Sequence, residues 1–391
     1  MTSAADLDAL LSAPGAELLA SLRGQEVTPG TALALGTRLR ESHPPGLVAA
    51  ALAQHELRLA ARAKFSRAMD MFFTRAGLEQ ASAEVVARHR QVRFAAAGVL
   101  ADLCCGIGGD LAALAGDHQV RAVDRDPLHL RMAMLNAAAY GVAGSVRTTQ
   151  ADVREADLAG VDAVFIDPAR RTDRGTGKHR LGPGASEPPL AWCLELAGRV
   201  PAVGIKAAPG IARDAVPAGW ELEFVAVGRD LKEGVAWSPS LAGPATRATI
   251  LPGGDTLTPQ PGPAVPVAAP GPFLLDPNPA VTRAGLVAEL ARALGAWQID
   301  QQIAFLCTDT AVRTPFARTL QVIDSGPWNQ KRLPARLRDL GIGAVDIRRR
   351  GLAGDVGQLH RQLKLTGSRR ATLVMTRVAD RPWGLVCLDL P

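Results

Sequence analysis

Three carboxylates stand at the ends of short apolar stretches in the middle of the chain. Asp124 ends QVRAVD, Asp152 lies in QADV, and Asp167 follows DAVFI. Short apolar runs that stop at polar residues are typical of buried strands, and ligands of such sheets bind at the carboxyl ends of the strands. Because carboxylates accept hydrogen bonds from hydroxyl, amino and ammonium groups, this order predicts a site for a ligand that carries them.

The stretch ahead of these carboxylates, VLADLCCGIGGD, is rich in glycine. Gly106 and Gly108 would let the backbone turn tightly and approach a ligand closely. A nicotinamide dinucleotide would need a small residue at Leu111, and Asp110 would repel its pyrophosphate. A ligand without phosphates fits better, and S-adenosylmethionine is one. Asp102 could then accept a hydrogen bond from its ammonium group, through water.

The spacing assigns roles to the next two carboxylates. Asp124 lies 18 residues after Gly106, which suits a carboxylate at a strand tip that binds both ribose hydroxyls. Asp152 could accept a hydrogen bond from the adenine amino group. Any one aspartate is more often a loop residue or a helix cap, but the ordered set indicates a nucleoside cofactor site.

The elements that must position these residues alternate between strand and helix. From residue 98 onward, apolar runs are separated by helical stretches such as PLHLRMAMLNAAAYG, which predicts an α/β fold with a parallel sheet. Residues 1–92 have helical periodicity, residues 253–272 are a Pro/Gly-rich linker or loop, and residues 273–391 contain a small α+β domain. The chemistry is therefore expected within residues 93–252.

Composition limits the class of protein. The chain has 391 residues, of which 47% are hydrophobic, and no apolar run reaches the length of about 18 residues that spans a bilayer. Five cysteines at irregular spacing predict neither a disulfide framework nor a zinc site, so no metal is expected. No basic segment before an apolar core marks a signal peptide. We expect a cytoplasmic, reduced protein without membrane partners.

Positive charge is concentrated towards the end of the chain. The whole sequence has a net charge of +6, and residues 281–391 hold 17 lysines and arginines against 9 acidic residues, a net charge of +8 that leaves −2 elsewhere. Such asymmetry suggests a polyanionic partner. The alternative is a coding bias, because 38 arginines against 6 lysines is typical of GC-rich genes.

The motifs DLCCGIGGD, AVDRD, QADV and IDPAR resemble the successive motifs of class I S-adenosylmethionine-dependent methyltransferases. The resemblance covers roughly residues 99–171 and implies a Rossmann-like sheet. It implies that Asp124 holds the ribose, that Asp152 holds the adenine and that Gly106 and Gly108 run beneath the methionine part. Asp167 would end the fourth strand beside the donor methyl group.

The acceptor motif departs from the pattern of this family. Amino-methylating members read Asp/Asn-Pro-Pro-aromatic, which implies that Asp167 and Pro168 orient the acceptor, but Arg170 stands here in place of the aromatic residue. Trp237 could supply the missing stacking surface, and the alternative is that Trp237 is a core residue. RNA uracil C5-methyltransferases read Asp-Pro-Pro-Arg with a cysteine after the next strand, where this chain has GIKAAPGI. We therefore expect methylation of a nucleobase nitrogen.

Two neighbouring segments could complete the site. Ser82 is expected to be the N-cap of a helix within residues 76–94, and a similar helix in trimethylguanosine synthase-like RNA methyltransferases implies that Gln80 and Ser82 reach the methionine end. Residues 170–184 form a basic, glycine-rich segment. Arg170 and Arg171 would suit a phosphate backbone, although a solvated loop would have the same composition.

The basic C-terminal region resembles the THUMP-like domain found in a group of bacterial methyltransferases. The resemblance covers roughly residues 322–388, and related THUMP domains bind RNA, usually tRNA. It implies RNA contacts at Arg348, Arg349, Arg350 and Lys364, with an ordinary solvated surface as the alternative. The resulting hypothesis is a methyltransferase that acts on tRNA or rRNA. The alternatives are a non-catalytic RNA-binding protein with a vestigial cofactor site, and a DNA or protein methyltransferase.

Overall fold

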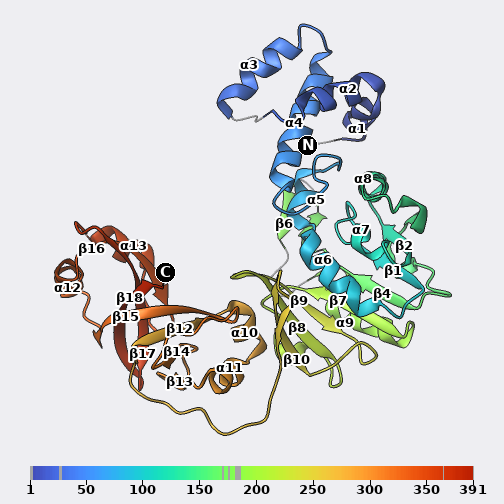
Figure 1. Ribbon diagram of the computed structural model, residues 1–391. Coiled ribbons are helices and arrows are strands. Elements are labelled where there is room, and N and C mark those ends of the chain that lie inside the picture. The colour runs from blue at the N-terminus through green and yellow to red at the C-terminus, as the bar shows by residue number, and fades with distance from the viewer. Residues whose placement is uncertain are drawn as a thin grey trace. The chain divides into compact units, whose positions relative to one another are not determined.

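The computed structural model describes residues 3–25, 29–169, 171–174, 177–180, 186–363 and 365–390, with the backbone alone at 29, 171–174 and 177–180. The chain divides into two compact units. Unit 1 comprises residues 1–221 and 235–243, and unit 2 comprises residues 222–234 and 244–391. Each unit is described by itself below (Figure 1).

Unit 1 begins with four helices that pack on one another. The first, α1, starts with a capping box in which Ser3 and Asp6 exchange backbone hydrogen bonds. Buried leucines such as Leu7 and Leu22 join these helices in one apolar core, which also includes Ile107 and Met132. Their bounds are α1 (Ala4–Leu11), α2 (Ala13–Leu22), α3 (Pro29–Leu39) and α4 (Pro45–Ala61).

A nine-stranded sheet follows, in the order β11-β10-β8-β9-β7-β4-β1-β2-β3. Its part from β7 to β3 is parallel throughout, as the alternation of strand and helix predicts. Strand β4 is apolar and buried throughout, and β1 is buried from Leu100 to Leu103 with Asp102 as its one polar residue, which is typical of parallel strands covered on both faces. The bounds of the parallel strands are β1 (Val99–Leu103), β2 (Gln119–Asp124), β3 (Val146–Gln150), β4 (Ala163–Ile166) and β7 (Ala202–Ala207).

Short helices connect these strands. The N-cap of α8 is Asp126, whose side chain accepts from the backbone N–H groups of Leu128 and His129, and Pro127 follows it at the first helical position. The helices of this part are α5 (Arg75–Gln80), α6 (Glu84–Gln91), α7 (Leu111–Leu114), α8 (Pro127–Ala139) and α9 (Leu190–Glu195), with 3₁₀ turns η1 (Val92–Phe94), η2 (Ala143–Ser145), η3 (Val153–Glu155), η4 (Leu196–Gly198) and η5 (Arg213–Ala215). Strands β5 (Arg171–Arg174) and β6 (Gly177–Arg180) pair antiparallel in a separate two-stranded sheet.

One buried asparagine fixes α8 to two loops. The side chain of Asn136 donates to the carbonyl oxygens of Phe72 at 3.0 Å and Ile107 at 2.8 Å. It also accepts from the N–H of Phe72 at 2.7 Å. Because Ile107 belongs to the glycine-rich stretch, this amide holds that stretch against both α8 and the segment that leads into α5.

Unit 2 contains a seven-stranded sheet in the order β13-β14-β12-β15-β18-β17-β16. Strands β16 and β17 are parallel, and the pairs that β18 makes with β15 and β17 are antiparallel. Apolar residues of α12 and α13 pack with those of β16 and β17 in one core. The bounds are β12 (Phe273–Pro277), α10 (Pro279–Ala284), α11 (Val287–Leu294), β13 (Trp297–Gln298), β14 (Leu306–Thr308), β15 (Ala317–Pro327), α12 (Leu333–Asp339), β16 (Ile342–Arg349), α13 (Val356–Gln362), β17 (Arg369–Val378) and β18 (Arg381–Asp389).

The remaining strands belong to the larger sheet. They are β8 (Glu221–Val227), β9 (Asp230–Trp237), β10 (Thr246–Leu251) and β11 (Asp255–Leu257), with β10 parallel to β8 and antiparallel to β11. Part of the Pro/Gly-rich stretch is thus a strand. The guanidinium of Arg292 donates to the carbonyl oxygens of Gln260 and Pro263 in the same stretch.

The expected fold class is confirmed. A helical N-terminal region leads into a Rossmann-like sheet, and a small α+β sheet domain follows. Within the described part of the chain, no helix has both the length and the apolar character needed to cross a membrane.

The buried amide of Asn136 generates a stability prediction. In Asn136→Leu, the N–H and C=O of Phe72 and the C=O of Ile107 lose their partner. Each buried unpaired group costs about 1–3 kcal/mol, so the free energy of unfolding should fall by about 3 kcal/mol or more. Urea denaturation measures it, and Asn329→Leu at an exposed turn serves as the control, with an expected loss of about 1 kcal/mol or less. A loss of under about 1 kcal/mol at position 136 would contradict this role.

Candidate active site

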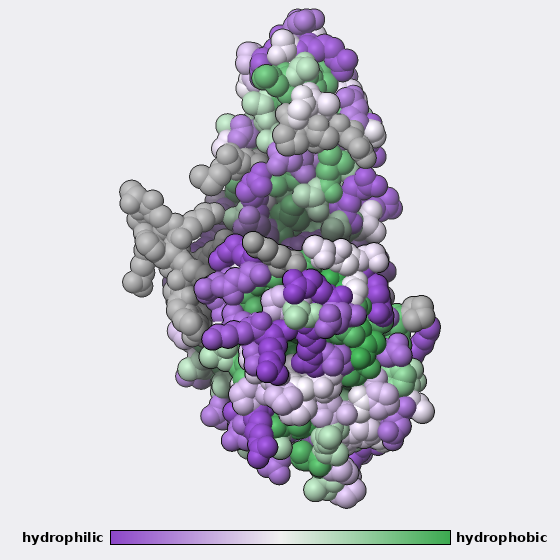
Figure 2. Space-filling view, turned by 90° about the vertical axis from the view of Figure 1, so that its left-hand side faces the viewer, coloured by the Kyte–Doolittle hydropathy of each residue, from purple (hydrophilic) through white to green (hydrophobic). Residues whose placement is uncertain are grey.

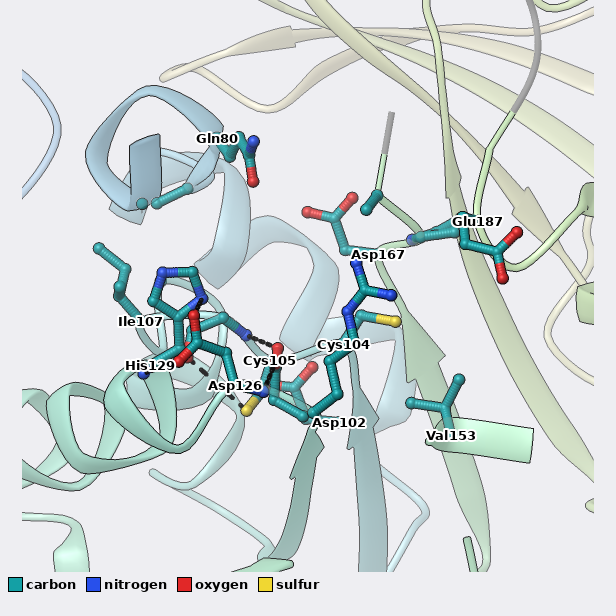
Figure 3. Close-up of a pocket in the computed structure, with 18 of the residues that line it drawn as sticks. Gln80, Asp102, Cys104, Cys105, Ile107, Asp126, His129, Val153, Asp167 and Glu187 are labelled. Carbon is teal, nitrogen blue, oxygen red and sulfur yellow. Dashed lines mark hydrogen bonds and ion pairs between the residues drawn. The ribbon is translucent and has the colours of Figure 1, made fainter. Parts of the chain in front are cut away.

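A pocket of about 420 Å³ lies in unit 1 at the carboxyl ends of β1, β2 and β4. Its lining comes from α5, the glycine-rich stretch, the start of α8, the turn after β3 and the residues that follow β4. In Figure 3 the side chains of Gln80, Asp102, Asp167 and Glu187 surround this pocket, each from a different element. The parallel topology therefore gathers side chains that lie far apart in the sequence.

Asp102 lines the pocket and has a buried carboxylate oxygen without a hydrogen-bond partner among the described residues. The residue is only 1% exposed, and this oxygen is its Oδ2 atom. Burial, reinforced by the negative charges of Asp110 and Asp167, raises the pKa of Asp102 well above its ordinary value. A buried carboxylate without a partner is costly, so this atom is suited to a cationic or hydrogen-bond-donating ligand group.

Gly106 and Asp124 form a preorganised corner of the pocket. The Oδ2 atom of Asp124 accepts from the N–H of Gly106 at 2.8 Å, and Oδ1 accepts from the N–H of Asp126 at 2.9 Å. Two backbone donors thus orient the carboxylate, and each oxygen retains a lone pair for a ligand hydroxyl. Gly106 has a φ of +54°, and a side chain there would project into open space. A larger residue would be strained and would fill room that a ligand needs.

Asp152 lines the pocket beyond β3 and is already part of an ion-pair network. Its Oδ1 atom caps η3 through the N–H of Arg154, and the guanidinium of Arg154 lies 3.2 Å from Oδ2. Arg154 also pairs with Glu187, whose backbone exchanges two hydrogen bonds with Ala169. This network connects the proposed adenine side of the pocket with the segment that follows Asp167.

The charges of the pocket fit S-adenosylmethionine. Among the described lining residues are eight carboxylates and two arginines. Such a surface attracts a ligand with sulfonium and ammonium groups and disfavours a phosphate-bearing one. Together with the unpaired Asp102 and the oriented Asp124, the residues present match the groups of this cofactor. When bound, it would supply a methyl group on a sulfonium, which departs as a neutral thioether.

Asp167 and Pro168 also line the pocket, at the end of β4. Behind Asp167 lies Lys206, on the neighbouring strand β7, with its Nζ atom 2.5 Å from Oδ2 of Asp167. The lysine side chain is 6% exposed and that of Asp167 is 25% exposed, so the carboxylate faces the pocket and the ammonium group faces the interior. The sequence analysis did not predict a role for Lys206, although a lysine within the otherwise apolar GIKAAPGI could have indicated one.

Ser82 differs from its expected role. The N-cap of α6 is Ala83, which has no capping side chain. Ser82 instead donates to Oδ2 of Asp110 at 3.0 Å and accepts from Nζ of Lys206 at 3.1 Å. Neither Ser82 nor Gly108 is among the residues that line the pocket, whereas Gln80 is. The hydroxyl therefore bridges two charged groups, as the donor to one and the acceptor from the other.

Asp110 is held by a second buried pair. Its Oδ1 atom pairs with the guanidinium of Arg90, which is 1% exposed and lies 4.6 Å above the ring of Phe165. A continuous series of polar contacts therefore runs from Arg90 through Asp110, Ser82 and Lys206 to Asp167. Charged groups can be buried at this depth because each one has a partner.

The cysteines near the pocket are protonated thiols at neutral pH. Burial raises the pKa of Cys104 and Cys105 well above the usual range, and raises that of Cys193 to about 12. A thiolate is the nucleophilic form of cysteine, so these residues are poorly suited to covalent catalysis. Trp237 is no stacking surface, because it is fully buried and packs edge-on against Phe94.

Of the predicted RNA-binding residues, Arg348, Arg349 and Arg350 have described side chains. Arg170 and Lys364 are outside the described residues, and of Arg171 only the backbone is described. Arg348 and Arg349 are exposed at the end of β16.

Arg350 has a structural partner. Its guanidinium lies 3.0 Å from Asp276 and 5.1 Å from the centre of the Phe305 ring, with 27% of the side chain exposed. Arg229 pairs with the same buried carboxylate at 2.9 Å.

Three families match parts of the chain. The family described as RNA cap guanine-N2 methyltransferase matches residues 97–180, a THUMP domain-like family matches residues 317–388, and a domain family of unknown function matches residues 3–61. A crystal structure of a protein from Porphyromonas gingivalis W83, classed as a methyltransferase, is similar in fold. Its TM-score is 0.69 at 20% identity, over 93% of this chain and 99% of that one.

A curated relative establishes the family. An uncharacterised S-adenosylmethionine-dependent methyltransferase of Mycobacterium tuberculosis, from strains CDC 1551 and H37Rv, is 38% identical over 318 residues, which are 78% of this chain and 84% of the relative. The chain belongs to this family of S-adenosylmethionine-dependent methyltransferases. The resemblance to class I methyltransferases with a THUMP-like domain is confirmed, and S-adenosylmethionine is the cofactor.

The raised pKa of Asp102 predicts that cofactor binding depends on pH. Below this pKa, Asp102 is protonated in the free protein and must lose its proton to receive an ammonium group. Affinity for S-adenosylhomocysteine should therefore rise with pH towards the raised pKa and level off above it, with proton release on binding. Calorimetry in buffers of different ionisation enthalpy, across about pH 5 to 8, measures both quantities.

Asp102→Asn should bind more weakly and lose this pH dependence. Asp157→Asn, in an exposed loop outside the pocket, should retain it. The same slope and proton release in Asp102→Asn as in the wild type would exclude Asp102 as the titrating group.

Proposed function

We propose that this methyltransferase modifies a nucleobase nitrogen in tRNA or rRNA. The observation that carries the proposal is the combination of a pocket-facing carboxylate, Asp167, with thiols that stay protonated. The pocket thus offers a hydrogen-bond acceptor for an amino group and lacks, among its described lining residues, a thiolate for attack on carbon. The match to RNA cap guanine-N2 methyltransferases over residues 97–180, which include the end of β4, supports the same reaction class.

In the proposed reaction, Asp167 accepts a hydrogen bond from the acceptor N–H and turns the nitrogen lone pair towards the methyl group. A carbon–nitrogen bond would form as the carbon–sulfur bond breaks, and the methylated nitrogen would release its proton to solvent. The protein mainly contributes position, because the sulfonium is already a good leaving group. No Phe, Tyr or Trp lines the described part of the pocket, so an aromatic stack on the base is absent from that lining.

The choice of RNA as substrate rests on the C-terminal unit. Its THUMP-like match covers residues 317–388, and the net charge of +8 falls in residues 281–391. Hydrophilic residues, with apolar ones between them, lie on the face that Figure 2 turns towards the viewer. Lys331, Arg332 and Arg338 on and beside α12 are exposed, and no ion pair joins them to another described residue. They, Arg348 and Arg349 are among the exposed charges that we propose for phosphate contacts.

The role of Asp167 can be tested by comparing turnover with cofactor affinity. Asp167→Ala should retain the affinity for S-adenosylhomocysteine within a few-fold and lose about 10² or more in turnover, the effect of removing one well-placed polar group. Turnover is measured with radiolabelled S-adenosylmethionine and bulk RNA from a deletion strain. Asp157→Asn is the control.

Nucleoside mass spectrometry of tRNA and rRNA from the same strain should show one methylated base missing. Transfer to duplex DNA or protein but not to RNA would refute the proposed substrate. Undiminished turnover in Asp167→Ala would refute the role of the carboxylate.

The ion pairs of unit 2 allow a matched test of RNA binding. Arg348→Ala/Arg349→Ala removes two exposed charges, and Arg370→Ala/Arg377→Ala removes two that pair with nearby aspartates. Each lost phosphate contact flattens the plot of log affinity against log salt by about 0.7–0.9. The first variant should therefore lose up to about 1.8 units of slope with unfractionated tRNA, and the second much less.

Fluorescence anisotropy titrations at several salt concentrations give these slopes. Equal slopes for both variants would show that only net charge matters. An unchanged slope in the first variant would remove Arg348 and Arg349 from the RNA surface.

A further inference from the structure

Lys206 is a buried charge that the proposed reaction has not yet used. It lies near the end of β7, and its Nζ atom contacts Oδ2 of Asp167 at 2.5 Å and Oγ of Ser82 at 3.1 Å. Because β7 pairs with β4 in the parallel sheet, the lysine approaches Asp167 from the strand next to the one that carries it. The ammonium group thus has fixed partners on two sides.

For the stability of the fold alone, an apolar side chain at position 206 would be less costly to bury than an ammonium group. The neighbouring Val203 and Ile205 are fully buried, and removing an ammonium group from water is expensive. Buried ion pairs seldom stabilise a fold more than well-packed apolar residues do. Lys206 extends from this interior to the carboxylate of Asp167 in the pocket. The pair is therefore better explained by a function of that carboxylate than by stability of the fold.

We propose that Lys206 is a positioning residue for methyl transfer. It holds one oxygen of Asp167 so that the other is presented to the acceptor nitrogen. The proposal rests on the function proposed above for Asp167. Ser82, which Asp110 and Arg90 hold in turn, fixes the lysine from behind. A carboxylate that is anchored through one oxygen cannot rotate away, and such orientation is the main contribution a protein makes to this type of reaction.

The first test separates position from cofactor binding. Lys206→Met should bind S-adenosylhomocysteine within about threefold of the wild type and lose about 10- to 100-fold in turnover, as expected when a reacting group is displaced by about an ångström. The KM for RNA should change little. Lys206→Arg keeps a cation and should recover most of the turnover. Lys232→Met is the matched control at an exposed ion pair and should behave like the wild type.

A double-mutant cycle identifies the residue through which Lys206 acts. In the Asp167→Ala background, Lys206→Met should cause no further loss of turnover, because the carboxylate that it positions is gone. If the two losses multiply, the lysine acts elsewhere and the proposal is overturned. Wild-type turnover in Lys206→Met, or no recovery in Lys206→Arg, would overturn it too.

A comparison of crystal structures tests the positioning role of Lys206 even if no RNA accepts a methyl group. Crystal structures of the full chain with S-adenosylhomocysteine should show the Asp167 carboxylate in one orientation in the wild type and in a different or mixed orientation in Lys206→Met. An unchanged carboxylate in the variant would overturn the positioning role. If the methionine variant does not fold, Lys206→Gln replaces it, and thermal unfolding confirms that the compared proteins are folded. Lack of transfer to RNA with a displaced carboxylate would instead refute the proposed substrate alone.

Discussion

A buried series of charged and polar groups connects the helices of unit 1 to the end of its parallel sheet. Arg90 on α6 pairs with Asp110 after the glycine-rich stretch, Ser82 bridges Asp110 to Lys206 on β7, and Lys206 pairs with Asp167 after β4. A charge removed from water requires a partner, so each member constrains the position of the next. The edge of the pocket is therefore set by several elements at once.

The same constraint divides the pocket into different chemical environments. Asp124 is oriented by two backbone N–H groups, whereas Asp102 has an oxygen without a partner and a pKa raised by burial. Asp167 is anchored by a cation. These three carboxylates have the same chemistry in the sequence but different surroundings, and we propose that one receives hydroxyl groups, one a cation and one an acceptor amino group. The high pKa values of the nearby thiols are consistent with a reaction in which orientation matters more than nucleophilic attack.

Pairing also distinguishes the arginines of unit 2. Arg350 and Arg229 share the buried carboxylate of Asp276, and Arg370 pairs with Asp346 on the adjacent strand. These guanidinium groups contribute to the structure of the sheet domain and are less available to a polyanion. The exposed charges on and around α12 and at the end of β16 have no such partners among the described residues. Net charge alone therefore overstates the number of arginines and lysines that have no carboxylate partner.

The sequence by itself determined the α/β class, the helical start of the chain and the cofactor, because apolar periodicity and the order of glycine and aspartate at strand ends are local properties. It also placed Gln80, Asp102, Gly106, Asp124, Asp152, Asp167 and Pro168 in one region, and all of these line the pocket. Only the tertiary structure decided which partners the charged groups find. Ser82 has the residue type of a helix cap but lies between Asp110 and Lys206, and Lys206 meets Asp167 across 39 residues of sequence. Trp237 and Arg350 likewise became structural residues because their surroundings are assembled from distant strands, and spacing along the chain carries no information about such contacts.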